Sequence, residues 1–164
     1  MATPTTLPAA FVSGNVLEAS QLNNLRGAFR VLQVVQATSS TQTTITSTSY
    51  VTTGLNATIT PSATTSKILI YANIPFQGAG SQNVNVTLFR GTVAGTNLAA
   101  NAEGFGIFAT GTIVPVAPLS MFWLDSPSTT SAQTYTAGFK TTGGTVYAQV
   151  GNATSAMILM EISA

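Results

Sequence analysis

Beyond Val31, hydrophobic residues recur at every second position, which is the period of a β-strand with one buried face. The run "KILIYANIPF" is the clearest case, and five of its apolar residues share one face: Ile68, Ile70, Ala72, Ile74 and Phe76. Leu69, Tyr71 and Asn73 fall on the other face. The runs "VNVTLFR" and "TYTAGFK" alternate in the same way and group Val84, Val86 and Leu88, and Tyr135, Ala137 and Phe139. The pattern predicts several short strands.

Turn-forming residues separate these runs along the chain, as at Pro61-Ser62 and Pro127-Ser128. Short strands at this spacing predict an all-β fold, a jelly-roll-like antiparallel β-sandwich. The segment "TTGGT" predicts a hairpin turn into "VYAQV". The last run, "AMILMEIS", is apolar on both faces, which predicts a central or interface strand.

The stretch "ATSSTQTTITSTSYVTTG" is almost entirely threonine and serine, so it is either a disordered linker or a strand with one wet face. Ile45 and Tyr50 sit among β-branched threonines, which suit a pleated, half-exposed surface. Disordered segments are instead enriched in proline, glutamate and glycine. We therefore expect a strand from about Thr41 to Val51.

The first thirty residues follow a different pattern. Pro4 and Pro8 favour an extended arm over residues 1–14. Asn15 then offers a helix N-cap with Glu18 three residues later, and Leu22, Leu25 and Phe29 keep helical spacing. We expect one short helix from about Val16 to Arg26, with Phe29 as its outer limit. The chain thus divides into an attachment segment, residues 1–30, and a β domain, residues 31–164.

Charge is scarce: only 5% of the residues are Asp, Glu, Lys or Arg, where about 25% is usual, and the net charge is +1. Without a basic field, binding to nucleic acid is not expected. A surface of Thr, Ser, Asn and Gln repels its neighbours weakly, which suits self-association, a fixed place in an assembly, or a secreted module. The apolar runs are too short to span a membrane, and the start resembles no signal peptide.

Few side chains suited to catalysis are present, because the 164 residues include no histidine and no cysteine. Nucleophilic triads and thiolate or imidazole metal sites are therefore excluded. Of the four carboxylates, Glu18 is explained by the helix start, and Glu161 is expected to have a structural partner such as an arginine. Glu103 and Asp125 remain as a pair that nothing in the sequence brings together. We expect no enzyme, no cofactor and no metal.

Gly14, Leu17, Ala19, Leu22, Asn23 and Leu25 form the pattern "G-x-x-L-x-A-x-x-L-N-x-L" ahead of the first strand. With this entry motif, the chain resembles the virion structural proteins of tailed bacteriophages, of the tail-fibre or head-decoration type. The segments "VLQVVQATSSTQTTITSTSYVTTGLNATITPSATTSKILIYANIPF", "VNVTLFRGT", "QTYTAGFKTTGGTVYAQV" and "AMILMEISA" look like the β domain of the same group.

The resemblance implies a β domain that trimerises about a threefold axis and an N-terminal segment that attaches to the particle. The residues expected to bind the partner, the major capsid protein or a tail protein, are Pro4, Pro8, Phe11, Leu17, Leu22, Leu25 and Phe29. The residues expected at the trimer interface are Phe122, Trp123, Met157 and Leu159. Trp123 could also stack on a sugar ring, although alternation between core and interface is the commoner arrangement for such an aromatic pair.

The leading hypothesis is a non-enzymatic, homotrimeric capsid decoration (cement) protein or short head fibre, on the virion surface and made in the host bacterial cytoplasm. The alternative is a tail fibre or receptor-binding tip that recognises a host surface glycan through the loops at 78–83 and 91–101. A Thr-rich ice-binding or adhesin module is a third class, and "TITST" is its only short repeat.

Overall fold

The computed structural model describes residues 31–78, 82–109 and 116–163. The expected arm, the expected helix and all seven residues assigned to partner binding lie outside the described residues, so these remain predictions. Within the described part, the chain forms strands and one 3₁₀ turn, with no α-helix. None of the helical structure described there is long and apolar enough to cross a membrane.

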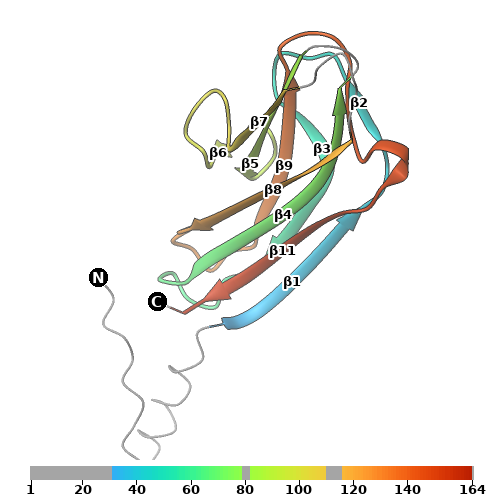
Figure 1. Ribbon diagram of the computed structural model, residues 1–164. Coiled ribbons are helices and arrows are strands. Elements are labelled where there is room, and N and C mark those ends of the chain that lie inside the picture. The colour runs from blue at the N-terminus through green and yellow to red at the C-terminus, as the bar shows by residue number, and fades with distance from the viewer. Residues whose placement is uncertain (1–30, 79–81, 110–115, 164) are drawn as a thin grey trace, which may run out of the picture.

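Eleven strands make up the described fold (Figure 1). Their bounds are β1 Val31–Ser39, β2 Thr43–Ile45, β3 Val51–Ile59, β4 Lys67–Gly78, β5 Asn83–Arg90, β6 Thr96–Asn97, β7 Gly106–Ala109, β8 Ala117–Asp125, β9 Gln133–Thr141, β10 Val146–Ala148 and β11 Ser155–Ile162. A 3₁₀ turn, Val150–Asn152, precedes β11.

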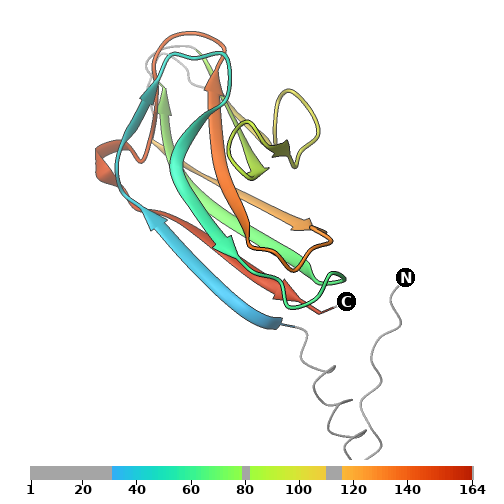
Figure 2. The ribbon, with the colours of Figure 1, turned by 180° about the vertical axis from the view of Figure 1, so that it is seen from behind.

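The strands form two antiparallel sheets that pack face to face (Figures 1 and 2). Sheet A has the order β1-β11-β4-β8, and the short strands β10 and β2 extend it beside one end of β4. Sheet B has the order β3-β9-β5, with β6 and β7 both paired to β5. The eight main strands β1, β3, β4, β5, β7, β8, β9 and β11 pass between the sheets in the jelly-roll order, which confirms the predicted fold class.

The core fills the space between the two sheets, and its residues are those that the alternation predicts. The five residues of the β4 face, Ile68 to Phe76 in steps of two, have no exposed surface. The predicted faces of β5 and β9 are equally buried. The Phe76 and Phe139 rings meet across the sandwich with their centroids 5.6 Å apart. Burying each such side chain contributes about 1.5–3 kcal/mol, so the core supplies most of the drive to fold.

The Thr/Ser stretch is ordered, but the strand predicted from Thr41 to Val51 is wrong in extent. Between Thr41 and Val51 the chain forms the short strand β2, and it then bends before β3 begins at Val51. The Ser47 hydroxyl causes part of this bend, because it accepts from the Ser49 amide and donates to the Ser49 carbonyl. Such local bonds compete with a sheet ladder, which explains why β-branched threonines alone did not extend the strand.

The hairpin predicted at "TTGGT" is also wrong. β9 belongs to sheet B, whereas β10 pairs with β2 and β4 in sheet A. The glycine turn therefore carries the chain from one sheet to the other. Gly144 has φ +74°, a left-handed conformation that glycine adopts without steric cost.

Candidate interaction surface

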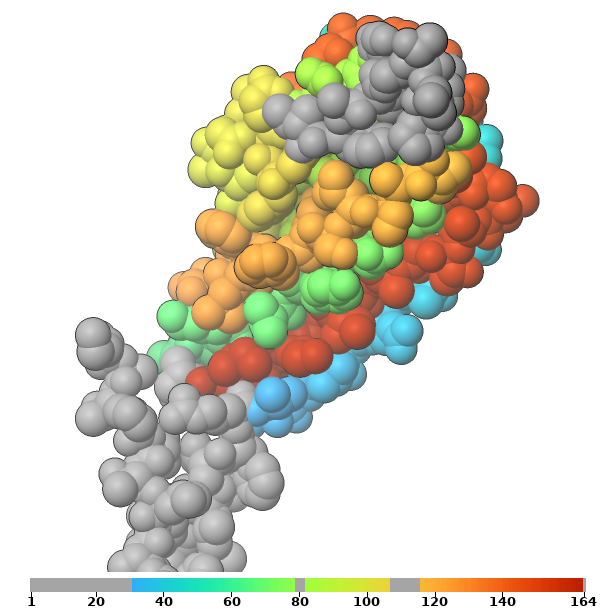
Figure 3. Space-filling model, viewed as in Figure 1, coloured from blue at the N-terminus to red at the C-terminus, as the bar shows by residue number. Residues whose placement is uncertain are grey.

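The side chains of sheet A that point away from sheet B form a surface that we call the outer face. Its residues come from β1, β11, β4 and β8, where exposure alternates with the buried positions of the core. They are Val34, Gln36, Thr38, Ala156, Ile158, Met160, Ile162, Lys67, Leu69, Tyr71, Asn73, Pro118, Ser120, Phe122 and Leu124. Figure 3 shows these strands as neighbouring blue, red, green and orange bands on the side facing the viewer.

The strand register arranges the outer face in cross-strand rows. One row is wholly apolar: Val34, Met160, Leu69 and Leu124. The next has one polar member: Gln36, Ile158, Tyr71 and Phe122. The third row is largely polar: Thr38, Ala156, Asn73 and Ser120. Asn73 Nδ2 donates to Ser120 Oγ at 2.7 Å, so this third row forms a hydrogen-bonded polar rim.

Several large apolar side chains on the outer face are exposed to solvent. Phe122 is 72% exposed and Val34 is 58% exposed, and Tyr71 and Leu124 are also exposed. Trp123 points to the opposite side of β8, where its ring lies 5.2 Å from that of Phe105, yet 39% of its surface is accessible. Three consecutive apolar residues of an edge strand are thus open to water. A contiguous apolar patch with a polar rim usually marks a contact surface.

The outer face carries almost no charge. The described charged residues are Lys67, Arg90, Glu103, Asp125, Lys140 and Glu161, and Lys67, at the start of β4, is the member of this set that lies on the face. The carboxylates interact elsewhere in the sandwich. Contact with another uncharged surface would therefore require little desolvation of ions.

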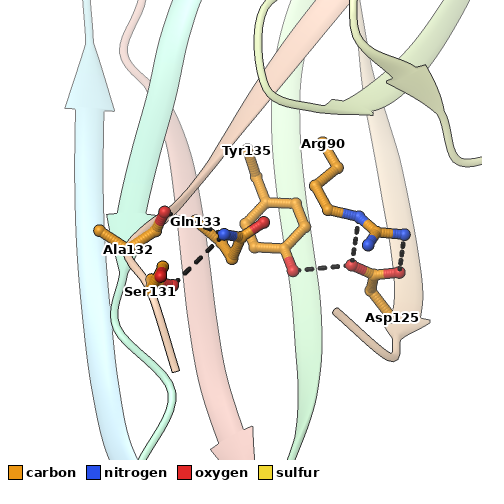
Figure 4. Close-up of polar contacts among 6 residues, drawn as sticks. All are labelled: Arg90, Asp125, Ser131, Ala132, Gln133 and Tyr135. Carbon is orange, nitrogen blue, oxygen red and sulfur yellow. Dashed lines mark hydrogen bonds and ion pairs between the residues drawn. The ribbon is translucent and has the colours of Figure 1, made fainter. Parts of the chain in front are cut away.

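Asp125 joins the end of β8 to sheet B (Figure 4). Arg90 Nε lies 3.1 Å from Asp125 Oδ2, and Arg90 Nη2 donates to Oδ1 at 3.2 Å. The Tyr135 hydroxyl donates to Asp125 Oδ2 at 2.8 Å. Burial raises the pKa of Tyr135, and its hydrogen bond to Asp125 raises it further. The cluster fixes the position of the exposed edge strand β8.

Glu161 makes a second link, at the edge of sheet A where β1 begins. Its Oε1 accepts from the Ser62 amide at 2.7 Å and the Ser62 hydroxyl at 2.6 Å, and its Oε2 accepts from Gln33 Nε2 at 2.6 Å. Burial raises the pKa of Glu161, but these bonds and one from Ser66 outweigh burial and lower it to about 2. The expectation of an arginine partner for Glu161 was wrong, because neutral donors bind this carboxylate.

Glu103, the other carboxylate considered for catalysis, has partners of its own. It accepts from Asn85 Nδ2, and its amide donates to Asn101 Oδ1. Asn101 therefore closes the loop that follows β6, and the Tyr50 hydroxyl donates to the Ala102 carbonyl in the same loop. In the described part of the chain, no three His, Cys, Asp or Glu residues gather as metal ligands.

The four residues expected at the trimer interface fall in two places. Phe122 and Trp123 are exposed on β8, where a partner could cover them. Met157 and Leu159 have no exposed surface, because their side chains point into the core of a single chain. Both were expected at the trimer interface, but the core of a single chain already covers their side chains. The apolar residues left partly exposed on β11 are those on the other face, which are Ala156, Ile158, Met160 and Ile162.

Sequence reasoning missed Val34, Tyr71, Leu124 and Met160 as surface candidates. The signal was present, since each lies on the non-core side of a strand and is nevertheless apolar. A strand that is apolar on both faces packs one face into its own core and presents the other to a second contact surface.

No protein-family model matches the chain, and no curated protein matches it in sequence. Among solved structures, the chain is similar to VP2 of infectious bursal disease virus in a subviral particle, with 16% identity over 80% of this chain and 32% of that chain, and a TM-score of 0.46. The structure of the Gx strain of the same virus gives 14% identity over 80% of this chain and 32% of that chain, and a TM-score of 0.45. The T13 particle of that virus gives 12% identity over 80% of this chain and 35% of that chain, and a TM-score of 0.40. The chain spans about a third of the length of these structures, and likeness at this level does not extend to function.

Proposed function

We propose that the protein is a non-enzymatic structural component of a tailed-bacteriophage virion. In this proposal it is a homotrimer that decorates the capsid as a cement protein or stands on it as a short head fibre. The observation that carries the proposal is the outer face of sheet A, which is apolar, exposed and almost uncharged on an otherwise complete sandwich. The sequence resemblance in the entry motif and the β domain supports a place on a phage particle.

The mechanism consists of binding energy alone. The β domain supplies a rigid body, because the two sheets share one core and Asp125 ties them together at β8. Residues 1–30 attach the domain to the capsid or tail. Three linked attachment segments bind with a raised effective concentration, so that three weak contacts together give a high overall affinity.

The test is the number of copies per particle, counted by quantitative mass spectrometry of purified virions. A capsid decoration protein should be present in hundreds of copies.

Deletion of residues 2–14 should abolish incorporation into particles while leaving the β-rich circular-dichroism spectrum intact. Unchanged incorporation of the shortened chain would contradict the attachment role of the N-terminal segment.

The second candidate, a tail fibre or receptor-binding tip, is favoured by one feature. The predicted recognition loop at residues 91–101 is held by side-chain hydrogen bonds, among them Thr87 Oγ1 to Asn97 Oδ1 at 2.6 Å and Asn97 Nδ2 to the Asn101 carbonyl at 2.9 Å. A rigid, amide-rich loop suits recognition of a neutral glycan. A copy number of a few per particle, together with specific binding to host cells, would favour this candidate over decoration.

A further inference from the structure

We infer that the outer face of sheet A is the surface that copies of this chain share, and that it faces the threefold axis. This inference rests on the proposed trimer and names the residues that form it. A second copy is the occupant that the charge distribution favours. The face holds one lysine and no carboxylate, so copies that bring their outer faces together around an axis repel each other little, whereas a strongly charged partner would form no ion pairs with it.

The size of the face agrees with a contact between protein copies. Sheet A presents four main strands at a spacing of about 4.8 Å, and alternate residues along a strand are about 6.7 Å apart. The three cross-strand rows then have a flat footprint of about 400 Å², to which side-chain relief and the open edge at Trp123 add. Specific interfaces bury about 800 Å² from each partner, which is of the same order.

The arrangement of the exposed residues favours a ring over a twofold dimer. A ring needs two different contact strips on each copy, because each copy touches its neighbours through different surfaces. The outer face offers Phe122 and Leu124 on β8 at one edge of the sheet, and Val34 on β1 at the other. Val31 and Leu32, at the start of β1, are also exposed. Joining the β8 strip of one copy to the β1 strip of the next closes a ring. It also covers two sheet edges that would otherwise be open to unwanted pairing.

The test compares variants of the full chain by sedimentation velocity over a concentration series. Phe122→Glu and Val34→Glu each place a charge on one strip, at positions that are 72% and 58% exposed, so a single chain tolerates both. Thr58→Glu is the matched control, because Thr58 is exposed on β3 of sheet B. The native chain and Thr58→Glu should sediment as trimers. Each outer-face variant should need at least about a hundred-fold higher concentration to assemble, because an unpaired charge is buried in the contact.

The outcomes separate the inference from the function on which it rests. A native chain that stays monomeric would overturn both the trimer and the shared face. Trimers that persist in Phe122→Glu and Val34→Glu would overturn the shared face alone, and would indicate that residues 1–30 or another protein covers it. Dissociation of Thr58→Glu to the same extent would also overturn it. Circular dichroism of each variant confirms that the sandwich is intact.

Discussion

Replacing Glu161 by Gln should remove most of the acid sensitivity that this carboxylate gives to the fold. Glu161 has no exposed surface, and hydrogen bonds from Ser62, Ser66 and Gln33 favour its charged form. These bonds join β11 to β1 and to the turn between β3 and β4. Glutamine keeps the shape of the side chain, but it presents an NH₂ group where one of the carboxylate oxygens accepted, so at least one donor loses its partner.

The magnitude follows from the pKa of Glu161, which is lowered from 4.5 to about 2. A pKa lowered by folding adds stability that is fully present above the unfolded value of 4.5 and is lost as the pH falls towards 2. The full contribution is up to about 3 kcal/mol at neutral pH, and about 2 kcal/mol of it should be gone by pH 3. The native chain should therefore lose about 2 kcal/mol more than Glu161→Gln between pH 6 and pH 3.

The assay is urea denaturation at pH 6, 5, 4 and 3, with one protein concentration throughout, because association also changes apparent stability. Ser62→Ala removes one hydroxyl donor but keeps the backbone amide, and should give an intermediate pH dependence. Ser131→Ala, at an exposed serine remote from Glu161 in sequence and not among its partners, is the control and should follow the native curve. Parallel curves for the native chain and Glu161→Gln would refute the reasoning.

Three further predictions concern core packing, an ion pair and backbone geometry. Met157→Ala should lower the free energy of unfolding by about 2–5 kcal/mol, whereas Met160→Ala, on the outer face, should lower it by less than half as much in dilute solution. Equal losses of stability in urea denaturation would argue against the faces assigned to these two residues. Asp125→Asn should cost about 1–3 kcal/mol, because it weakens an ion pair and a buried hydrogen bond together; an unchanged denaturation midpoint would count against its role in holding β8. Gly104→Ala should lower the melting temperature much more than Gly151→Ala, since both have positive φ but a Cβ at Gly104 would lie 2.2 Å from a backbone carbonyl oxygen and at Gly151 would meet nothing within 4 Å.

Alternation along the chain was enough to predict the sandwich and the buried face of β4, because a period of two leaves each residue one of two sides. It could not predict where a strand stops when the interruption comes from a local bond, as at Ser47. It could not show that β9 and β10 lie in different sheets, since adjacent strands in sequence do not have to pair. It also could not decide which side of "AMILMEIS" faces inward. Partners distant in sequence, such as Gln33 and Ser62 for Glu161, are set by the assembled fold.

The distance between equivalent residues in neighbouring copies tests the shared face most directly. The chain has no cysteine, so Tyr71→Cys and Thr58→Cys each give one site for a spin label, the first at the centre of the outer face and the second on the exposed side of sheet B. Pulsed electron paramagnetic resonance on the assembled protein should give a short, single distance for the label at position 71 and a clearly longer one at position 58. A shorter distance at position 58 than at position 71 would contradict the account.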